Sequence, residues 1–117
     1  MSPRTARKRR GGGLAEAAPV FAALGDETRL DLVLRLCSGG PMSITRLTEG
    51  TQVTLQAVTK HLHVLADAGL AHGTRVGRDR VWEIDAERLD DARQWLAHIE
   101  GQWDRALNRL KASLERP

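Results

Sequence analysis

Apolar residues recur every three or four positions along most of this chain, which predicts a protein built mainly from amphipathic helices. The first such pattern runs from Leu14 to Gly25, and the second follows Asp26, which is a favoured helix N-cap residue. The predicted inward residues of the first helix are Leu14, Ala17, Ala18, Phe21 and Leu24, and those of the second are Leu30, Val33, Leu34 and Cys37, with Leu32 and Leu36 beside them. The sequence Ser-Gly-Gly-Pro at residues 38–41 ends the second helix.

Two further helices are predicted in the middle of the chain. Ser43 caps a short helix that ends near Gly50, and Thr54 caps a longer helix that runs to about Ala68. The predicted inward residues of the longer helix are Leu55, Val58, Leu62 and Leu65. Gly69 then ends this helix, because glycine readily adopts the left-handed conformation found at many helix C-termini.

After Gly69 the pattern changes to short segments of alternating polarity. Residues 71–76 and 80–84 flank Gly77-Arg78-Asp79, which predicts a β-hairpin in which Trp82 and Ile84 share one face. From about residue 86 to residue 114 the helical pattern returns and predicts one long helix. Its apolar seam comprises Leu89, Ala92, Leu96, Ile99, Trp103, Ala106 and Leu110, broadened by Trp95, Leu107 and Leu114.

This order of elements predicts a mainly α fold with a small β-hairpin, a winged helix-turn-helix. In such a fold the second helix of the pair, here residues 54–68, enters the DNA major groove with its N-terminal residues against the bases. The predicted DNA-facing residues are Thr54, Leu55, Gln56, Thr59 and Lys60 on this helix, and Arg75, Arg78 and Arg80 on the wing, residues 71–84. Glutamine can form a bidentate pair with adenine, whereas lysine, arginine and threonine can also hold phosphates. The alternative for the wing is a solvated arginine-rich turn.

Charge is distributed unevenly along the chain. Lys and Arg number 18 and Asp and Glu number 15, and five of the basic residues lie within residues 1–13. The rest of the chain is therefore slightly acidic. The placement of its arginines is better evidence for nucleic-acid binding than its net charge is. Residues 1–13 are glycine-rich and nearly free of apolar residues, so we expect a flexible arm, either a solvated tail or a contact to phosphates or a minor groove. Residues 14–117 form the expected single domain.

Composition argues against several classes of protein. No run approaches the roughly 20 apolar residues that span a bilayer, so no membrane association is expected. The single cysteine, Cys37, rules out an internal disulfide and indicates a reducing compartment, the cytoplasm. We expect Cys37 to be a small buried apolar residue. Neither a phosphate-binding glycine loop nor a nucleophile–base pair is evident, so the chain is not expected to be an enzyme.

Three segments resemble signatures of the ArsR/SmtB family of bacterial winged-helix regulators. They are residues 23–30 (ALGDETRL), 58–70 (VTKHLHVLADAGL) and 77–84 (GRDRVWEI), and the likeness extends over about residues 15–114. The resemblance implies a homodimeric repressor of a palindromic operator that dimerises through its first and last helices. It also implies DNA-facing positions at Thr54, Gln56, Thr59, Lys60 and Arg78. The implied dimer-interface residues are Leu14, Phe21, Leu96, Ile99, Trp103, Leu107 and Leu110.

Apolar surface on the long last helix independently favours dimerisation, since a monomer this small would leave much of it exposed. The alternative is that Trp95 and Trp103 pack only on their own domain. Within the second signature, His61 is expected to pack against the fold or to contact the backbone, and His63 is expected to be exposed. Arg29, in the first signature, has either a structural or a phosphate-proximal role.

Many members of the family sense metals, and this chain lacks most of their ligands. Soft-metal sensors carry paired cysteines on the helix equivalent to residues 43–50, which contain no thiol. The last helix offers one histidine with three acids near it: His98, Asp91, Glu100 and Asp104. Zinc needs about four N, S or O ligands, and residues 95–107 also resemble a subgroup not known chiefly for metals, so we predict no metal and no other cofactor.

The small-molecule effector is not identifiable from the sequence. Two alternatives to a simple repressor remain. One is a ligand- or metal-responsive sensor of the same fold that uses His98 or a pocket at the dimer interface. The other is a winged-helix protein–protein interaction module that does not bind DNA.

Overall fold

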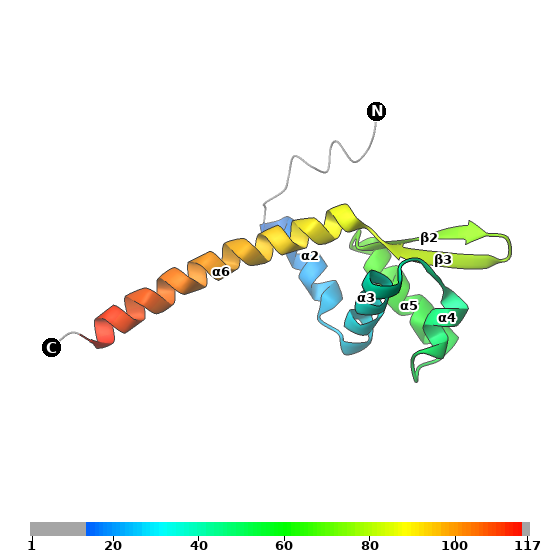
Figure 1. The fold of residues 1–117 in the computed structure, drawn as a ribbon, viewed down its shortest axis with the longest axis horizontal. Coiled ribbons are helices and arrows are strands. Elements are labelled where there is room, and N and C mark those ends of the chain that lie inside the picture. Colours follow the sequence, from blue (N-terminus) through cyan, green and yellow to red (C-terminus); the bar gives the residue numbers. More distant parts are fainter. Residues whose placement is uncertain (1–13, 116–117) are drawn as a thin grey trace, which may run out of the picture.

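The structure, a computed structural model, describes residues 14–115 of the chain (Figure 1). The helices are α2 (Leu14–Leu24), α3 (Glu27–Gly39), α4 (Ile44–Glu49), α5 (Leu55–Asp67) and α6 (Ala86–Leu114), and the strands are β1 (Met42–Ser43), β2 (Ala71–Val76) and β3 (Asp79–Ile84). Residues 1–13, the predicted flexible arm, lie outside the described residues, as do residues 116–117.

Polar side chains fix where three of the helices begin. The side chains of Asp26, Ser43 and Thr54 each accept a hydrogen bond from the backbone N–H three residues later, at 3.0, 3.2 and 3.1 Å. Each bond satisfies one of the backbone donors that the first turn of a helix leaves unpaired. The predicted starts of α3, α4 and α5 are therefore confirmed.

The Asp26 cap makes the stability of the fold depend on pH. The backbone N–H of Arg29, and then the positive charge of Arg29, hold the pKa of the Asp26 carboxyl below its usual value. A carboxyl whose pKa is lower in the folded state stabilises the fold when it is ionised, and this contribution is lost as the pH falls through the folded pKa. Asp26 therefore stabilises the fold at neutral pH and ceases to do so in acid.

Asp26→Ala is expected to lower the urea midpoint of unfolding at pH 7, and its difference from the parent protein is expected to shrink as the pH falls below about 4. Urea unfolding followed by circular dichroism at several pH values measures this. Asp26→Asn is the matched control, because asparagine also caps helices well but does not ionise. A difference between Asp26→Ala and the parent that is the same at pH 7 and in acid contradicts the prediction.

The three strands form one antiparallel sheet in the order β1-β3-β2. In the predicted hairpin, Gly73 pairs with Trp82 and Val76 pairs with Asp79, so the turn is two residues long and β3 begins one residue earlier than expected. Gly77 in this turn has a φ of +63°, which glycine adopts without steric cost. The two-residue strand β1, which pairs with β3, was not predicted.

Helices α2, α3, α4 and α5 and the sheet form the body of the molecule. The core lies where they meet the first half of α6. Its fully buried side chains are Val20, Leu32, Leu47, Val58, Leu62, Leu65 and Leu70. Three of these residues, Val58, Leu62 and Leu65, belong to α5, so the inward face of α5 is fixed and its opposite face is turned outward. Leu55, predicted to point inward, is 45% exposed instead, because it stands at the first position of α5, beyond the edge of the core.

The inward face of α3 differs from the prediction. Leu32, Val33 and Leu36 are buried, whereas Leu30 and Leu34 are 44% and 57% exposed. Cys37 is also exposed, so the prediction that it is buried is wrong. The physical reason is that two overlapping apolar stripes satisfy the same helical spacing, and the contacts of α3 with α2, α5 and β3 select the stripe that contains Leu32 and Leu36.

Helix α6 changes character along its 29 residues. Its first half packs on the body, where Ala92 and Trp95 are buried and the rings of Phe21 and Trp95 meet edge to face with centroids 6.2 Å apart. Its second half projects away from the body (Figure 1). There Trp103 is 64% exposed, so Trp95 packs on its own domain and Trp103 does not.

Candidate nucleic-acid interface

The outward face of α5 carries the residues predicted to contact bases. Gln56 and Lys60 are exposed and lie one helical turn apart, opposite the buried Val58 and Leu62. Residues on the outer face near the start of a helix are the ones that reach base edges when the helix enters a major groove. The structure therefore leaves Gln56 and Lys60 open to a duplex.

The two predicted threonines of α5 already take part in helix bonds. The Thr54 hydroxyl accepts the cap bond from Ala57, and the Thr59 hydroxyl donates to the carbonyl oxygen of Leu55 at 2.8 Å. A capping hydroxyl uses a lone pair and can still donate its proton, whereas the proton of Thr59 is engaged. Thr54 is thus the better phosphate donor of the two, and Thr59 is partly buried.

His63 extends the outward stripe of α5 and was not predicted to face DNA. It is exposed. Lys60 lies four residues after Gln56 and His63 lies three residues after Lys60, so the three side chains share one face of α5. The centroid of its ring lies 5.8 Å from that of Trp82, which places His63 at the contact between α5 and the wing. The spacing was visible in the sequence, but the contact with Trp82 depends on how the hairpin packs.

The wing brings two of its arginines directly opposite each other. Arg75 and Arg80 are cross-strand partners in the hairpin register, and both are exposed. Like charges in directly opposed positions repel, so an anion between them relieves the repulsion. The guanidinium carbon of Arg80 also lies 5.7 Å from the centroid of the Trp82 ring, which orients this side chain along the hairpin.

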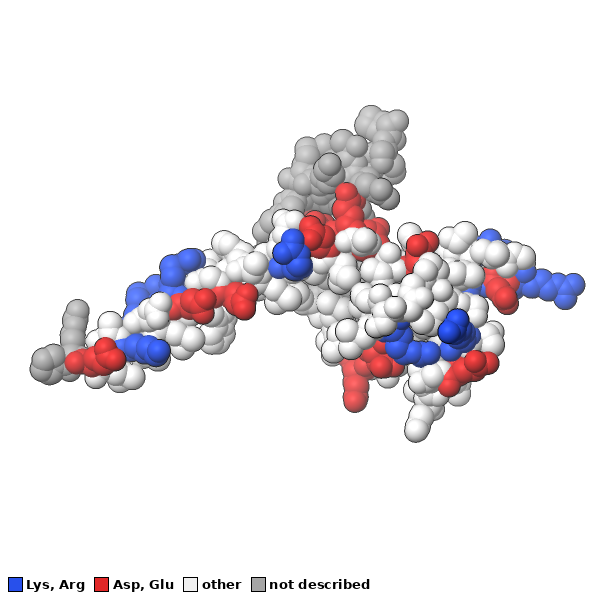
Figure 2. Space-filling model, viewed as in Figure 1, with Lys and Arg blue, Asp and Glu red and all other residues white. Residues whose placement is uncertain are grey.

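The third arginine, Arg78, stands in the two-residue turn at the end of the hairpin. Figure 2 shows basic side chains at this end of the molecule, with an acidic side chain beside them. A positive protrusion of this kind can reach a phosphate or a narrow minor groove. The wing therefore offers three cations beside the outward face of α5.

A second set of contacts holds α5 against the rest of the body. The Arg29 side chain donates from Nε to the carbonyl oxygen of Ala23 at 2.6 Å, and its Nη1 lies 3.2 Å from Nδ1 of His61. Nδ1 of His61 is also 3.8 Å from a carboxylate oxygen of Asp26. Arg29 thus has a structural role, since it ties α5 to the end of α2 and the start of α3.

Comparison with known proteins identifies relatives of this chain. Residues 24–74 match a family model described as a helix-turn-helix domain. The chain is 31% identical over 70 residues to the arsenical resistance operon repressor of Bacillus subtilis, covering 60% of this chain and 67% of the repressor. It is 35% identical to the solved structure of an ArsR-like transcriptional regulator from Rhodococcus sp. RHA1, with a TM-score of 0.70 and coverage of 88% of this chain and 96% of that one.

The chain belongs to the ArsR family. The solved homodimeric winged helix-turn-helix DNA-binding domain of a Mycobacterium bovis protein is a further relative, 26% identical with a TM-score of 0.61 over 93% of each chain. The predicted winged helix-turn-helix fold is confirmed. This ArsR-family protein is a DNA-binding transcriptional regulator, and its relatives are regulators rather than enzymes.

The described part of this ArsR-family chain holds no cluster of three or more histidine, cysteine or acidic side chains close enough to share a metal ion. His98, the one histidine of α6, is exposed and its Nε2 lies 3.3 Å from the side-chain nitrogen of Gln102. A carboxylate oxygen of Asp91 lies 3.7 Å from Nη1 of Arg88. Within residues 14–115, no helix has the length and apolar character required to cross a bilayer.

Proposed function

We propose that this ArsR-family regulator is a cytoplasmic homodimeric repressor that binds a palindromic operator, with α5 in the major groove and the wing on the adjacent backbone or minor groove. The observation that carries the proposal is the free polar stripe of α5 beside the opposed arginines of the wing. Gln56 reads bases in this arrangement, while Lys60, Arg75, Arg78 and Arg80 hold phosphates.

Dimerisation is supported by the second half of α6. Its apolar residues form one exposed row: Leu96, Ile99, Trp103, Leu107 and Leu110, with exposed fractions of 54%, 37%, 64%, 49% and 55%. A row of this length on a helix without a partner is the pattern of a helix–helix interface. The homodimeric state of the Mycobacterium bovis relative supports the same assembly.

The other predicted dimer residues lie on α2. Phe21 is partly buried against Trp95 of its own chain, so it has only part of its surface left for a partner. The side chain of Leu14 lies outside the described part of the molecule. In the proposed dimer a two-fold axis presents the two α5 helices to half-sites about 34 Å apart.

Gln56→Ala is expected to relax base preference, whereas Arg78→Ala is expected to weaken binding about equally on every sequence. The glutamine change should cost about 1–3 kcal/mol of discrimination at one base pair, and the arginine change should reduce the slope of log affinity against log salt by about 1. Selection of bound duplexes from random DNA, followed by gel-shift titration at several salt concentrations, measures both effects.

Arg105→Ala is the matched control, because it removes one exposed positive charge from α6, far from the wing. It is expected to change neither base preference nor salt slope. Equal loss of affinity for operator and random DNA in Gln56→Ala would overturn the base-reading role. Failure of the parent protein to retain any DNA at low salt, together with a stable protein partner, would favour the interaction-module alternative.

A further inference from the structure

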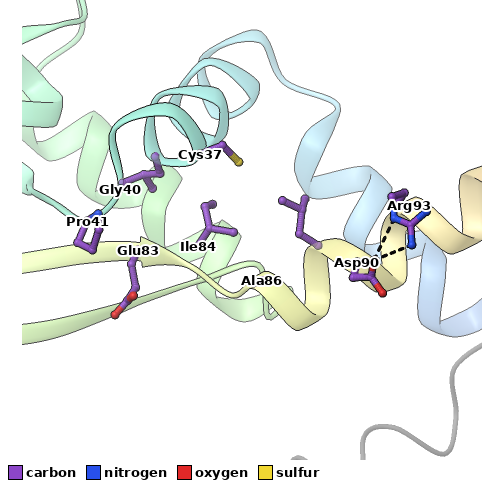
Figure 3. A pocket seen from close by; sticks show the side chains of 10 residues that line it. Cys37, Gly40, Pro41, Glu83, Ile84, Ala86, Asp90 and Arg93 are labelled. Carbon is purple, nitrogen blue, oxygen red and sulfur yellow. Dashed lines mark hydrogen bonds and ion pairs between the residues drawn. The ribbon is translucent and has the colours of Figure 1, made fainter.

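A cavity of about 450 Å³ opens where the end of α3, the end of β3 and the start of α6 meet (Figure 3). Its apolar walls come from Leu36, Cys37, Pro41, Ile84 and Leu89. A space of this size falls in the range that holds small organic ligands. None of the predicted DNA-facing or dimer-interface residues lines it, so the cavity is separate from both proposed surfaces.

The apolar floor of this cavity is recessed. Leu36 is only 2% exposed, and Ile84 and Leu89 pack partly buried against the core. Figure 3 shows the sulfur of Cys37 and the side chain of Ile84 facing the same space. A recessed apolar floor accepts the body of a small molecule, whereas the protruding row on α6 is what another helix packs against.

The rim of the cavity carries one carboxylate and one guanidinium, from Asp90 and Arg93. The Glu83 side chain leaves β3 on the side opposite Ile84, and its carboxylate lies 3.7 Å from Nε2 of His72. Nε and Nη2 of Arg93 each lie 2.9 Å from Oδ1 of Asp90, so this guanidinium already has its counterion. Hydrogen bonds from Arg93 and Gln94 also lower the pKa of Asp90, which keeps its carboxyl ionised. The two charges on the rim therefore neutralise each other, and the rim favours an uncharged group.

We propose that this cavity binds a small molecule with an aromatic or branched aliphatic body and an uncharged polar group, and that its occupancy changes the affinity of the regulator for DNA. The coupling follows from position, because Ile84 ends the wing strand β3 and Leu89 lies in the first turns of α6. A molecule bound between them has different affinities for conformations that differ in the angle of the wing, and its binding therefore shifts the populations of these conformations. The coupling to DNA rests on the proposed function, whereas the binding does not.

Thiol–disulfide exchange on the full-length protein tests the binding, because Cys37 is the only cysteine, is exposed and lies on the cavity wall. The protein is equilibrated with the disulfides of phenylethanethiol and of mercaptoethanol. We expect the phenylethyl adduct at Cys37 to be favoured about tenfold, because its ring leaves water. In the control Cys37→Ser/Thr74→Cys, the thiol stands on the exposed outer face of the wing, and we expect about equal adducts.

A second pair of thiol probes tests the charge of the rim. The mercaptomethyl derivatives of benzylamine and of benzoic acid have similar bodies and opposite charges. We expect about equal adducts of the two at Cys37 in the parent protein, because the Asp90–Arg93 pair is neutral. In Asp90→Asn the guanidinium of Arg93 loses its counterion, so we expect the preference to move toward the carboxylate.

Equal phenylethyl and hydroxyethyl adducts at Cys37, or a Cys37 thiol that does not react in the assembled protein, would overturn the binding site. The regulatory part is tested by gel shift of the two Cys37 adducts on a selected duplex, where we expect about a tenfold difference in affinity, as for coupled sites generally. Equal affinities would overturn the regulatory part. Failure of the unmodified protein to bind DNA would instead overturn the proposed function and leave the exchange result intact.

Discussion

Trp103→Asp is expected to convert the proposed dimer into monomers. Trp103 is 64% exposed in the single chain and lies at the centre of the apolar row on α6. Each interface residue occurs twice in a two-fold dimer, and the loss of a central tryptophan costs about 2–4 kcal/mol per copy. The dissociation constant of the dimer is therefore expected to rise at least about a thousandfold, as measured by analytical ultracentrifugation over a range of concentrations.

The same substitution tests the link between assembly and DNA binding. A monomer presents one recognition helix, so Trp103→Asp is expected to lose the tight binding to a two-half-site duplex and to keep weak binding to a half-site. His98→Asp is the matched control, since it adds the same charge to an exposed position on a different face of α6. A parent protein that sediments as a monomer at tens of micromolar, or a Trp103→Asp variant that remains dimeric, would contradict the proposed interface.

Local signals account for the parts of the fold that the sequence predicted well. Asp26 and Thr54 cap helices through their own side chains, and Gly69 and Gly77 adopt the positive φ values that end α5 and turn the hairpin. Each of these features depends on residues close by in the chain. The face of α3 was not predictable in the same way, because apolar residues fill five of the seven positions from Leu30 to Leu36 and the choice among them depends on tertiary contacts.

The candidate interface likewise contains features that the local sequence predicts and features that depend on tertiary contacts. The outward position of Gln56 and Lys60 follows from the periodicity of α5 once Val58 and Leu62 are placed inside. Arg75 lies opposite Arg80 because the turn has two residues. The expected three-residue turn would not have placed these two residues opposite each other. The contact between His63 and Trp82 depends on how α5 and β3 pack together, so the spacing of residues within either element could not predict it.

Trp82 holds the root of the wing, and Trp82→Ala is expected to lower the free energy of unfolding by about 3–5 kcal/mol. The side chain is 2% exposed and lies against His63 of α5. Its cross-strand partner is Gly73, which has no side chain to fill the resulting space. A Cβ added to Gly73 would come within 2.9 Å of the indole, so the indole occupies that space fully. Urea unfolding followed by circular dichroism measures the loss.

Trp82→Phe separates packing from hydrogen bonding at the same position. The indole Nε1 of Trp82 is buried and has no hydrogen-bond partner in the described part of the chain, so phenylalanine removes an unsatisfied donor while it keeps an aromatic ring. The relief of that donor offsets part of the lost packing, and we expect a cost of about 0–2 kcal/mol. DNA affinity is expected to survive in Trp82→Phe and to fall in Trp82→Ala, because the guanidinium of Arg80 packs on this ring. A phenylalanine variant as unstable as the alanine variant would show that the indole N–H is satisfied in solution.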